Sequence, residues 1–200
     1  MSRILFVRHG HSLSQLQTEV VTGRCPEFPL SDKGRGQAKL VASRLEAYSI
    51  SQMFSSPCKR TIETSDLISK QLGIPYTVEE ALTERSQGDF EMKPKDAVYT
   101  PETIKAIHAD QFRWAPPGGE SLENVGLRLT TFLQNLSSTE EDSCYLCVSH
   151  LMLLWSLFYL ATKCDHRILP RLKVENCGLV EVDFNAPDSF QLLRWNHSQG

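Results

Sequence analysis

Short apolar runs alternate with amphipathic segments along most of this 200-residue chain. A short apolar run suits a buried strand, and a segment whose apolar side chains recur at helical spacing suits a helix that covers a sheet. Alternation of the two favours parallel strand pairing, because each helix carries the chain back across the sheet. The sequence therefore predicts an α/β fold, a three-layer α/β/α sandwich with a mostly parallel central sheet.

Residues that begin and end helices divide this pattern into elements. Ser31 and Ser121 are N-cap candidates, and Asn124 stands where a capping-box glutamate would sit. Pro57 suits the first turn of a helix that Gly73 closes. Strands are expected at residues 4–7, 50–55, 76–78, 144–148, 172–174, 178–184 and 190–195, the last two as candidates for a hairpin across 185–189. Helices are expected at residues 33–47, 57–72, 101–110, 121–136 and 151–161.

The composition fits one compact globular unit. The hydrophobic share of 40% is enough to bury a core, and we expect residues 1–200 to form a single domain. The long, proline-bearing segment 92–119 is a candidate lid or insertion. The 21 basic and 24 acidic side chains give a net charge of -3 and no long basic run. Because nucleic-acid binding needs clustered positive charge, we expect no nucleic-acid partner.

The six cysteines do not indicate a disulfide framework. In a chain of this length with no secretory signal pattern at its first residues, they indicate reduced thiols and a cytoplasmic protein. Cys144 and Cys147 have the spacing of half a zinc or redox motif, but no second pair follows. Strand residues three apart also point to opposite faces. We therefore predict no metal site there.

The most apolar stretch, residues 144–161, approaches the length of a membrane span. Ser149 and His150 interrupt it near its centre. A buried strand that runs into a buried helix explains it better, and we expect no membrane anchor.

Cationic or titratable side chains follow three of the predicted strands. Arg8 and His9 follow the first strand. Arg60 lies just after the second, and His150 directly follows the strand at 144–148. Because the carboxyl ends of parallel strands open on one crevice, we expect these side chains to meet there and bind an anion. Taken alone, each arginine would be explained by a solvated surface position, and His150 by a buried position with its hydrogen bonds made. The prediction of an anion site therefore rests on all of them occurring at strand ends.

His9 and Glu84 are the groups that could carry a reaction at such an anion. A neutral imidazole has a free nitrogen lone pair and can attack phosphorus, while Arg8 beside it neutralises phosphoryl oxygens. A carboxylic acid at Glu84 could protonate the leaving oxygen and then deprotonate the attacking water. The alternative for Glu84 is a surface loop carboxylate. Three other carboxylates compete for the role: Glu79, Glu80 and Glu91.

Several short motifs, taken in order, match one known family. They are Arg8-His9-Gly10-His11-Ser12, Ser55-Ser56-Pro57 with Arg60 and Thr64, Leu82-Thr83-Glu84, Gly118-Gly119-Glu120-Ser121 and Val148-Ser149-His150, with Thr22-Gly23-Arg24 and Asn176-Cys177 in agreement. Their order and approximate spacing resemble the histidine phosphatase superfamily, in its phosphoglycerate mutase-like branch, over nearly the whole chain. The resemblance implies one histidine phosphatase-like domain.

The resemblance also implies a role for each matching residue. His9 would be the nucleophile that becomes phosphorylated, and Glu84 the proton donor. The phosphoryl oxygens would be held by Arg8, Arg60 and His150. The remaining substrate-binding positions would be Gln15, Thr22, Gly23 and Leu151. No metal or other cofactor is implied, because the arginines and an imidazolium supply the positive charge that Mg²⁺ supplies elsewhere.

The chain departs from the family pattern at four positions. The family usually has glutamate or glutamine at His11, asparagine at Gln15, and glycine at both Met92 and Leu151. Glycine after the second histidine lets the backbone approach phosphate closely, so leucine there bears on the rate of catalysis. For His11, a polar position at the rim is favoured over a second titrating group.

Three functions remain open from the sequence, each with a small phosphorylated metabolite as partner and a monomer or homodimer as the assembly. A phosphatase passes the phosphoryl group to water, a mutase returns it to a bound substrate, and a binding protein performs neither step. Mutases of the family resemble longer chains with a larger basic insertion after the catalytic glutamate. Here that segment holds only Lys93, Lys95, Lys105 and Arg113 as basic residues, so hydrolysis is favoured. The same segment, with Tyr99, Phe112 and Trp114, is the candidate substrate-selecting lid.

Overall fold

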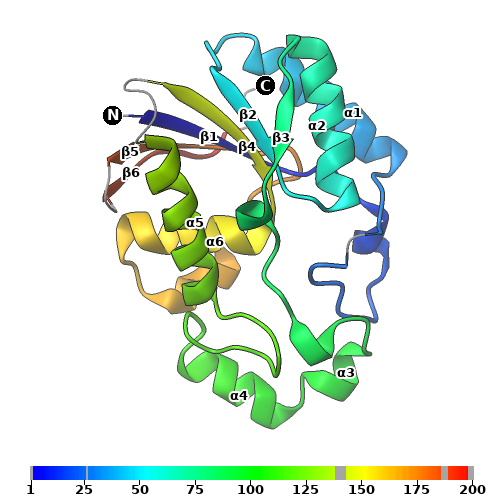
Figure 1. Ribbon diagram of the computed structural model, residues 1–200. Helices are drawn as coiled ribbons and strands as arrows, with labels where there is room; N and C mark the ends of the chain where they lie inside the picture. The colour runs from blue at the N-terminus through cyan, green and yellow to red at the C-terminus, as the bar shows by residue number, and fades with distance from the viewer. Residues whose placement is uncertain (1, 26, 138–142, 186–188, 198–200) are drawn as a thin grey trace.

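A computed structural model describes residues 2–25, 27–137, 143–185 and 189–197, which fold around one six-stranded sheet (Figure 1). The strand order is β3-β2-β4-β1-β5-β6. Four strands are parallel: β1 (Ser2–Arg8), β2 (Gln52–Ser55), β3 (Tyr76–Val78) and β4 (Cys144–Ser149). Two antiparallel strands complete one edge: β5 (Leu179–Asn185) and β6 (Ser189–His197). The predicted mostly parallel sheet is confirmed.

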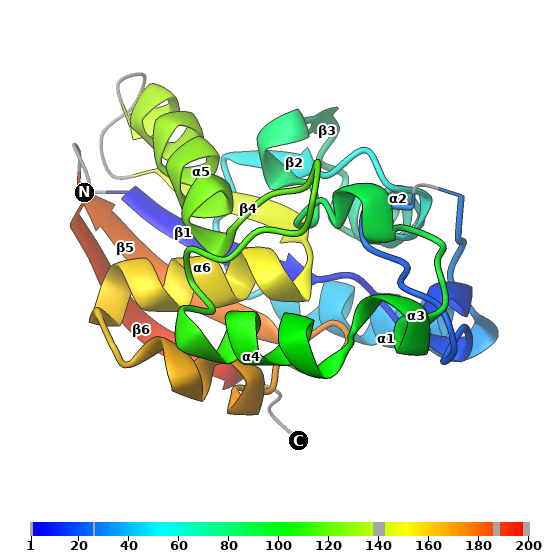
Figure 2. The ribbon, with the colours of Figure 1, turned by 90° about the horizontal axis from the view of Figure 1, so that it is seen from below.

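Helices cover both faces of the sheet and give the predicted three layers. One face packs against α1 (Asp32–Leu45) and α2 (Lys59–Leu72), and the other against α5 (Leu122–Ser137) and α6 (Leu151–Thr162). Four short 3-10 helices lie in the connections: η1 (Leu13–Leu16), η2 (Glu80–Leu82), η3 (Gly88–Phe90) and η4 (His166–Arg171). Two further helices, α3 (Lys95–Val98) and α4 (Pro101–Ala109), lie apart from the sheet (Figure 2).

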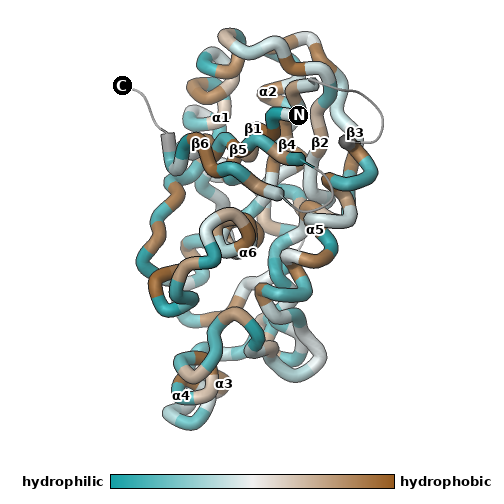
Figure 3. Tube along the Cα trace, turned by 90° about the vertical axis from the view of Figure 1, so that its left-hand side faces the viewer, coloured by the Kyte–Doolittle hydropathy of each residue, from teal (hydrophilic) through white to brown (hydrophobic). Residues whose placement is uncertain are grey.

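The central strands β1 and β4 are buried on both faces, as their unbroken apolar runs predict. Alternate residues face opposite layers: Phe6 and Cys147 pack under α5 and α6, whereas Leu5 and Val148 pack under α1 and α2. Cys144 packs on the side opposite to Cys147, so these two thiols do point to different faces. Hydrophobic residues accordingly recur along the strands and around α6 in Figure 3.

The structure corrects one predicted strand and the starts of two other elements. Residues 172–174 form no strand, because they pair with no neighbouring strand although Val174 is buried. The second strand begins at Gln52 rather than at residue 50, and the helix predicted from Pro57 begins two residues later at Lys59. The predicted pairing of the last two strands is confirmed, while residues 186–188 of the connecting turn lie outside the described part.

The apolar stretch at 144–161 is divided between β4 and α6, as predicted. Within the described ranges, no helix combines the length and the apolarity needed to cross a bilayer.

Side-chain caps fix where the helices beside the site begin. The Ser31 hydroxyl accepts a hydrogen bond from the Gly34 amide at 3.2 Å at the start of α1. At the start of α5, the Asn124 amide donates to the Ser121 hydroxyl and the Ser121 amide donates to the Asn124 side chain, each at 3.0 Å. Asparagine thus fills the place of the capping-box glutamate.

Two glycines of α1 have very different surroundings. A Cβ on Gly34 would lie 2.0 Å from the His11 carbonyl oxygen, whereas a Cβ on Gly36 would meet no atom within 4 Å. The loop after β1 is therefore held against the first turn of α1 at a position where any side chain would collide with backbone.

We expect Gly34→Ala to lower the free energy of unfolding by about 2–4 kcal/mol, because a backbone clash must be relieved. The matched change Gly36→Ala should raise it by roughly 0.5–1 kcal/mol through helix propensity alone. Urea unfolding followed by circular dichroism measures both. Equal effects of the two substitutions would contradict the close approach of the loop.

Candidate active site

The carboxyl ends of β1, β2 and β4 meet at one edge of the sheet and bring the predicted residues together. The His9 amide donates to the Ser149 carbonyl at 2.9 Å, and the Ser56 amide to the Val148 carbonyl at 3.1 Å. A cavity of about 180 Å³ opens there, which we call the inner chamber. Its lining includes eight predicted residues: Arg8, His9, Gln15, Thr22, Gly23, Arg60, Glu84 and Leu151. It also includes three that sequence reasoning missed: Ser14, Gln87 and Met152.

His9 is held as a neutral imidazole with one nitrogen free. Its Nδ1 lies 2.8 Å from the Gly10 carbonyl oxygen, which can only accept a hydrogen bond. Nδ1 therefore carries the proton, and Nε2 keeps its lone pair. Burial, followed by the nearby charges of Arg60 and Arg8, lowers the pKa of His9 well below 6.5. The side chain is thus in the form that a nucleophile requires.

His150, the ninth predicted residue, packs edge-on against His9, with their ring centroids 5.2 Å apart. The Ser56 hydroxyl lies 2.8 Å from its Nε2, while its buried Nδ1 has no hydrogen-bond partner in the described part of the chain. Burial, then Arg60 and His9, lowers the pKa of His150 well below 6.5, which favours the neutral side chain in the absence of an anion. A bound phosphoryl dianion would raise the pKa of His150 and so favour the imidazolium.

Arg60 is buried and Arg8 is half-buried, and neither has a carboxylate ion-pair partner among the described residues. Arg60 donates to the Gly23 and Cys25 carbonyls at 3.1 and 2.9 Å. Arg8 donates from Nη1 to the Val174 carbonyl at 2.6 Å, and its buried Nε has no hydrogen-bond partner in the same part. Burial lowers the pKa of Arg8, and the Glu84 charge opposes this. Two guanidinium groups that form no ion pair with a carboxylate of the described residues suit an anionic ligand.

Glu84 is the carboxylate that reaches the inner chamber, whereas Glu79, Glu80 and Glu91 do not line it. Its Oε1 accepts from the Arg85 amide at 2.9 Å, and its Oε2 from the Met152 amide at 3.4 Å. The second of these amides lies in the first turn of α6, so the helix amino terminus faces the carboxylate.

Three side chains from distant segments hold the backbone around Glu84, and we call them the Glu84 clamp: Arg24, Glu120 and Arg128. Arg128, from α5, donates to the Ala81 and Thr83 carbonyls at 2.5 and 2.8 Å. Arg24 donates to the Glu84 carbonyl at 2.8 Å. Glu120 pairs with both arginines, at 2.8 Å with Arg24 and at 3.1 Å with Arg128. Sequence reasoning gave no role to Arg128, which resembles any polar residue of an amphipathic helix.

The positions that depart from the family pattern have defined places. Leu151, at the start of α6, lines the inner chamber. Gln15 accepts a hydrogen bond from Asn176 at 2.9 Å, and the same amide donates to the His9 carbonyl. The His11 ring lies 2.8 Å from the Ser31 hydroxyl and does not line the chamber. Met92 has a φ of 60°, the left-handed region, which accounts for glycine being usual there.

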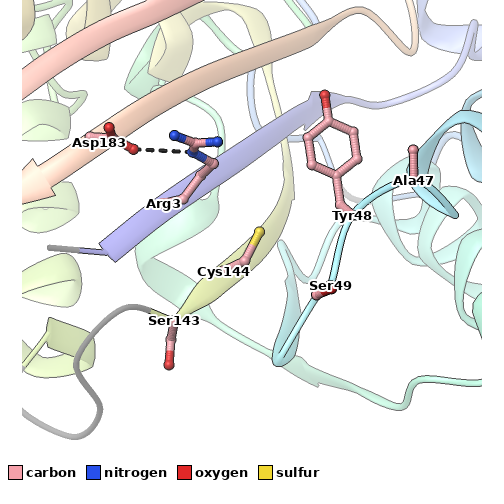
Figure 4. A pocket seen from close by; sticks show the side chains of 7 residues that line it. All are labelled: Arg3, Ala47, Tyr48, Ser49, Ser143, Cys144 and Asp183. Atoms are coloured by element: carbon pink, nitrogen blue, oxygen red, sulfur yellow. Dashed lines mark hydrogen bonds and ion pairs between the residues drawn. The ribbon is translucent and has the colours of Figure 1, made fainter.

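A separate cavity of about 480 Å³ lies at the amino ends of the parallel strands (Figure 4). Its wall includes Arg3, which is paired with Asp183 at 3.2 Å, and the thiol of Cys144. Burial raises the pKa of this thiol. The cavity contains none of the predicted site residues, so the inner chamber remains the candidate active site.

The fold and the site together define an α/β enzyme of the phosphatase class. The chain belongs to the histidine phosphatase superfamily (branch 1), whose family model matches residues 4–198. It is 29% identical over 186 residues to the probable phosphoglycerate mutase GpmB of Photorhabdus laumondii, covering 92% of this chain and 86% of the relative. It is 30% identical over 187 residues to the protein of the same name from Yersinia pestis strain Pestoides F, with the same coverage.

Solved structures agree with this assignment. The mycobacterial glucosyl-3-phosphoglycerate phosphatase complexed with VO3 superposes with a TM-score of 0.84 at 25% identity, covering 98% of this chain and 99% of that one. The α-ribazole phosphatase from Shigella flexneri gives a TM-score of 0.80 at 23% identity, covering 98% of this chain and 96% of that one. The second likeness concerns the fold alone.

The two neutral histidines make stability depend on pH. Folding lowers the pKa of both below 6.5, so the unfolded chain binds more protons as the medium becomes acidic. The free energy of unfolding should therefore fall as pH decreases through 6.5 toward the folded-state values. Urea unfolding at several pH values measures this fall. The double variant His9→Asn, His150→Asn should show a shallower decline, and an unchanged decline would contradict the assignment of neutral imidazoles.

Proposed function

We propose that this protein is a metal-independent phosphomonoester hydrolase that acts on a small phosphorylated metabolite through a phosphohistidine intermediate. The observation that carries the proposal is the inner chamber, whose lining brings together a neutral His9, the arginines Arg8 and Arg60, and the carboxylate of Glu84. A nucleophile, an anion-binding set and a proton donor thus share one small cavity.

In the first step, Nε2 of His9 attacks phosphorus, the bond from phosphorus to the ester oxygen breaks, and Glu84 gives its proton to that oxygen. In the second step, a water attacks the phosphohistidine, its proton passes to Glu84, and inorganic phosphate leaves with His9 restored. Glu84 therefore regains in the second step the proton that it gave in the first.

Arg8, Arg60 and His150 would bind the phosphoryl oxygens during both steps. The unpartnered Arg8 Nε and His150 Nδ1 are donors that these oxygens would satisfy. Preorganised donors of this kind each lower the barrier by about 3 kcal/mol. Gln15, Thr22, Gly23 and Leu151 would form the wall around the phosphoryl group.

Phosphoglycerate mutase activity is the second candidate, because curated relatives carry that name. A mutase must keep water away from the phosphohistidine and bind an acidic substrate. The segment 92–119 contributes only Lys95 and Tyr99 near the site, and its Arg113 is paired with Asp110 and Glu123. These features favour hydrolysis. A binding protein without catalysis would have no use for the carboxylate at Glu84.

The proposal is tested by turnover of a phosphomonoester panel that includes 3-phosphoglycerate, with EDTA present. We expect phosphate release by the wild type, a phosphoenzyme in the intact mass, and loss of both by at least about 1,000-fold in His9→Ala, because the nucleophile is gone. The control His108→Ala changes an exposed histidine of α4 and should retain activity. Isomerised product would indicate a mutase, and no turnover or phosphoenzyme on any ester would indicate a binding protein.

A second prediction concerns the Glu84 clamp. Arg128→Lys keeps the charge but loses the fork that holds two carbonyls, so Glu84 should shift. We expect kcat/KM, which reports the first step, to fall by about 10- to 100-fold for alkyl phosphates, whose leaving oxygen needs a proton, and by less than about 3-fold for p-nitrophenyl phosphate. The variant Glu84→Gln shows how the two substrates respond when the acid itself is removed. Arg113→Lys, at a surface ion pair, is the control. An equal loss on both substrates would mean that the clamp supports folding rather than the acid.

A further inference from the structure

The inner chamber continues into a larger cavity of about 280 Å³, which we call the outer chamber. The two share six lining residues: Ser14, Gln15, Thr22, Gly23, Gln87 and Met152. The outer chamber adds six of its own: Gln17, Thr18, Val20, Val21, Lys95 and Tyr99. A substrate whose phosphoryl group lies at His9 would therefore extend the rest of its structure into the outer chamber.

Neutral polar groups without internal partners line this route. Within the described residues, the side chains of Gln17, Thr22 and Tyr99 make no hydrogen bond to the protein. Burial raises the pKa of Tyr99, so its hydroxyl remains a neutral donor. The Tyr99 ring is fixed edge-on against Phe90, with centroids 6.1 Å apart. These groups can both donate to and accept from hydroxyl groups of a ligand.

Positive charge is scarce in the same place. Among the described residues that line the outer chamber, Lys95 is the one charged side chain, and it is exposed and donates to the Thr18 carbonyl at 2.6 Å. Arg85 is buried nearby, but it does not line the chamber; it donates to the Gln87 side chain at 3.1 Å and lies over the Trp114 ring. A second carboxylate or phosphate in the outer chamber would lose hydration without an arginine to replace it.

We propose that the substrate is a phosphomonoester of a neutral, hydroxyl-rich alcohol of monosaccharide size, that is, a sugar phosphate rather than a phosphorylated acid. Sugar hydroxyls match the amide and hydroxyl groups of the wall, and the apolar faces of a sugar ring match Val20 and Val21. The inference rests on the proposed function only in placing the phosphoryl group at His9.

The test is equilibrium binding to His9→Ala, which cannot consume the ligand, by titration calorimetry. Glucose 6-phosphate and ribose 5-phosphate should bind at least about tenfold more tightly than 3-phosphoglycerate. Equal or tighter binding of 3-phosphoglycerate, or no measurable preference, would overturn the proposal. Because binding is measured without turnover, a wild type that binds sugar phosphates but hydrolyses no ester would contradict the proposed function and leave this inference supported.

Two variants locate the preference in the outer chamber. Thr18→Arg adds a guanidinium to its wall and should strengthen binding of 3-phosphoglycerate by at least about tenfold, while Gln71→Arg adds the same charge to an exposed position near the end of α2 and should not. Tyr99→Phe should raise the ratio of the sugar phosphate Kd to the inorganic phosphate Kd by about fivefold, because one hydrogen bond is lost. Unchanged values for both outer-chamber variants would place the alcohol elsewhere.

Discussion

Arg60, His9 and His150 are buried at the carboxyl edge of the sheet with the half-buried Arg8 beside them, and the electrostatic repulsion among these groups is the constraint that the surrounding structure must satisfy. Both histidines respond by remaining neutral, since burial and the arginines lower their pKa values. The guanidinium groups donate to carbonyl oxygens of Gly23, Cys25 and Val174 rather than to carboxylates. Neither guanidinium group is therefore neutralised by a direct ion pair within the described residues, and a phosphoryl dianion would supply one.

The carboxylate opposite this cluster reaches the site by a different route. Glu84 lies in a connection after η2 rather than at the end of a strand, so the sheet does not fix its position. The Glu84 clamp supplies that position by hydrogen bonds from three remote segments to the backbone on either side. The anion-binding groups thus depend on the sheet, while the proposed proton donor depends on side-chain contacts between layers.

The segment that we propose selects the substrate is also separate from the residues that we propose carry out the reaction. The segment 92–119 folds into α3 and α4 at the margin of the molecule and touches the site through Lys95 and Tyr99. Aromatic contacts of Phe90 with Tyr99 and Trp114 tie this segment to the connection that carries Glu84. Under the proposed function, changes in the segment would therefore alter which alcohol is accepted without moving His9.

The sequence by itself determined the layers, the strands that carry Arg8, His9 and His150, and the edge at which they meet, because periodicity, caps and strand ends are local properties. It failed at residues 172–174, which pair with no strand in the described part of the chain. Only the tertiary structure decided that Glu84, and not Glu79, Glu80 or Glu91, lines the inner chamber. It also placed Gln87 in the wall of that chamber and Arg128 against the backbone beside Glu84. Those choices depend on side-chain directions in irregular turns and on contacts between distant segments, which no local pattern encodes.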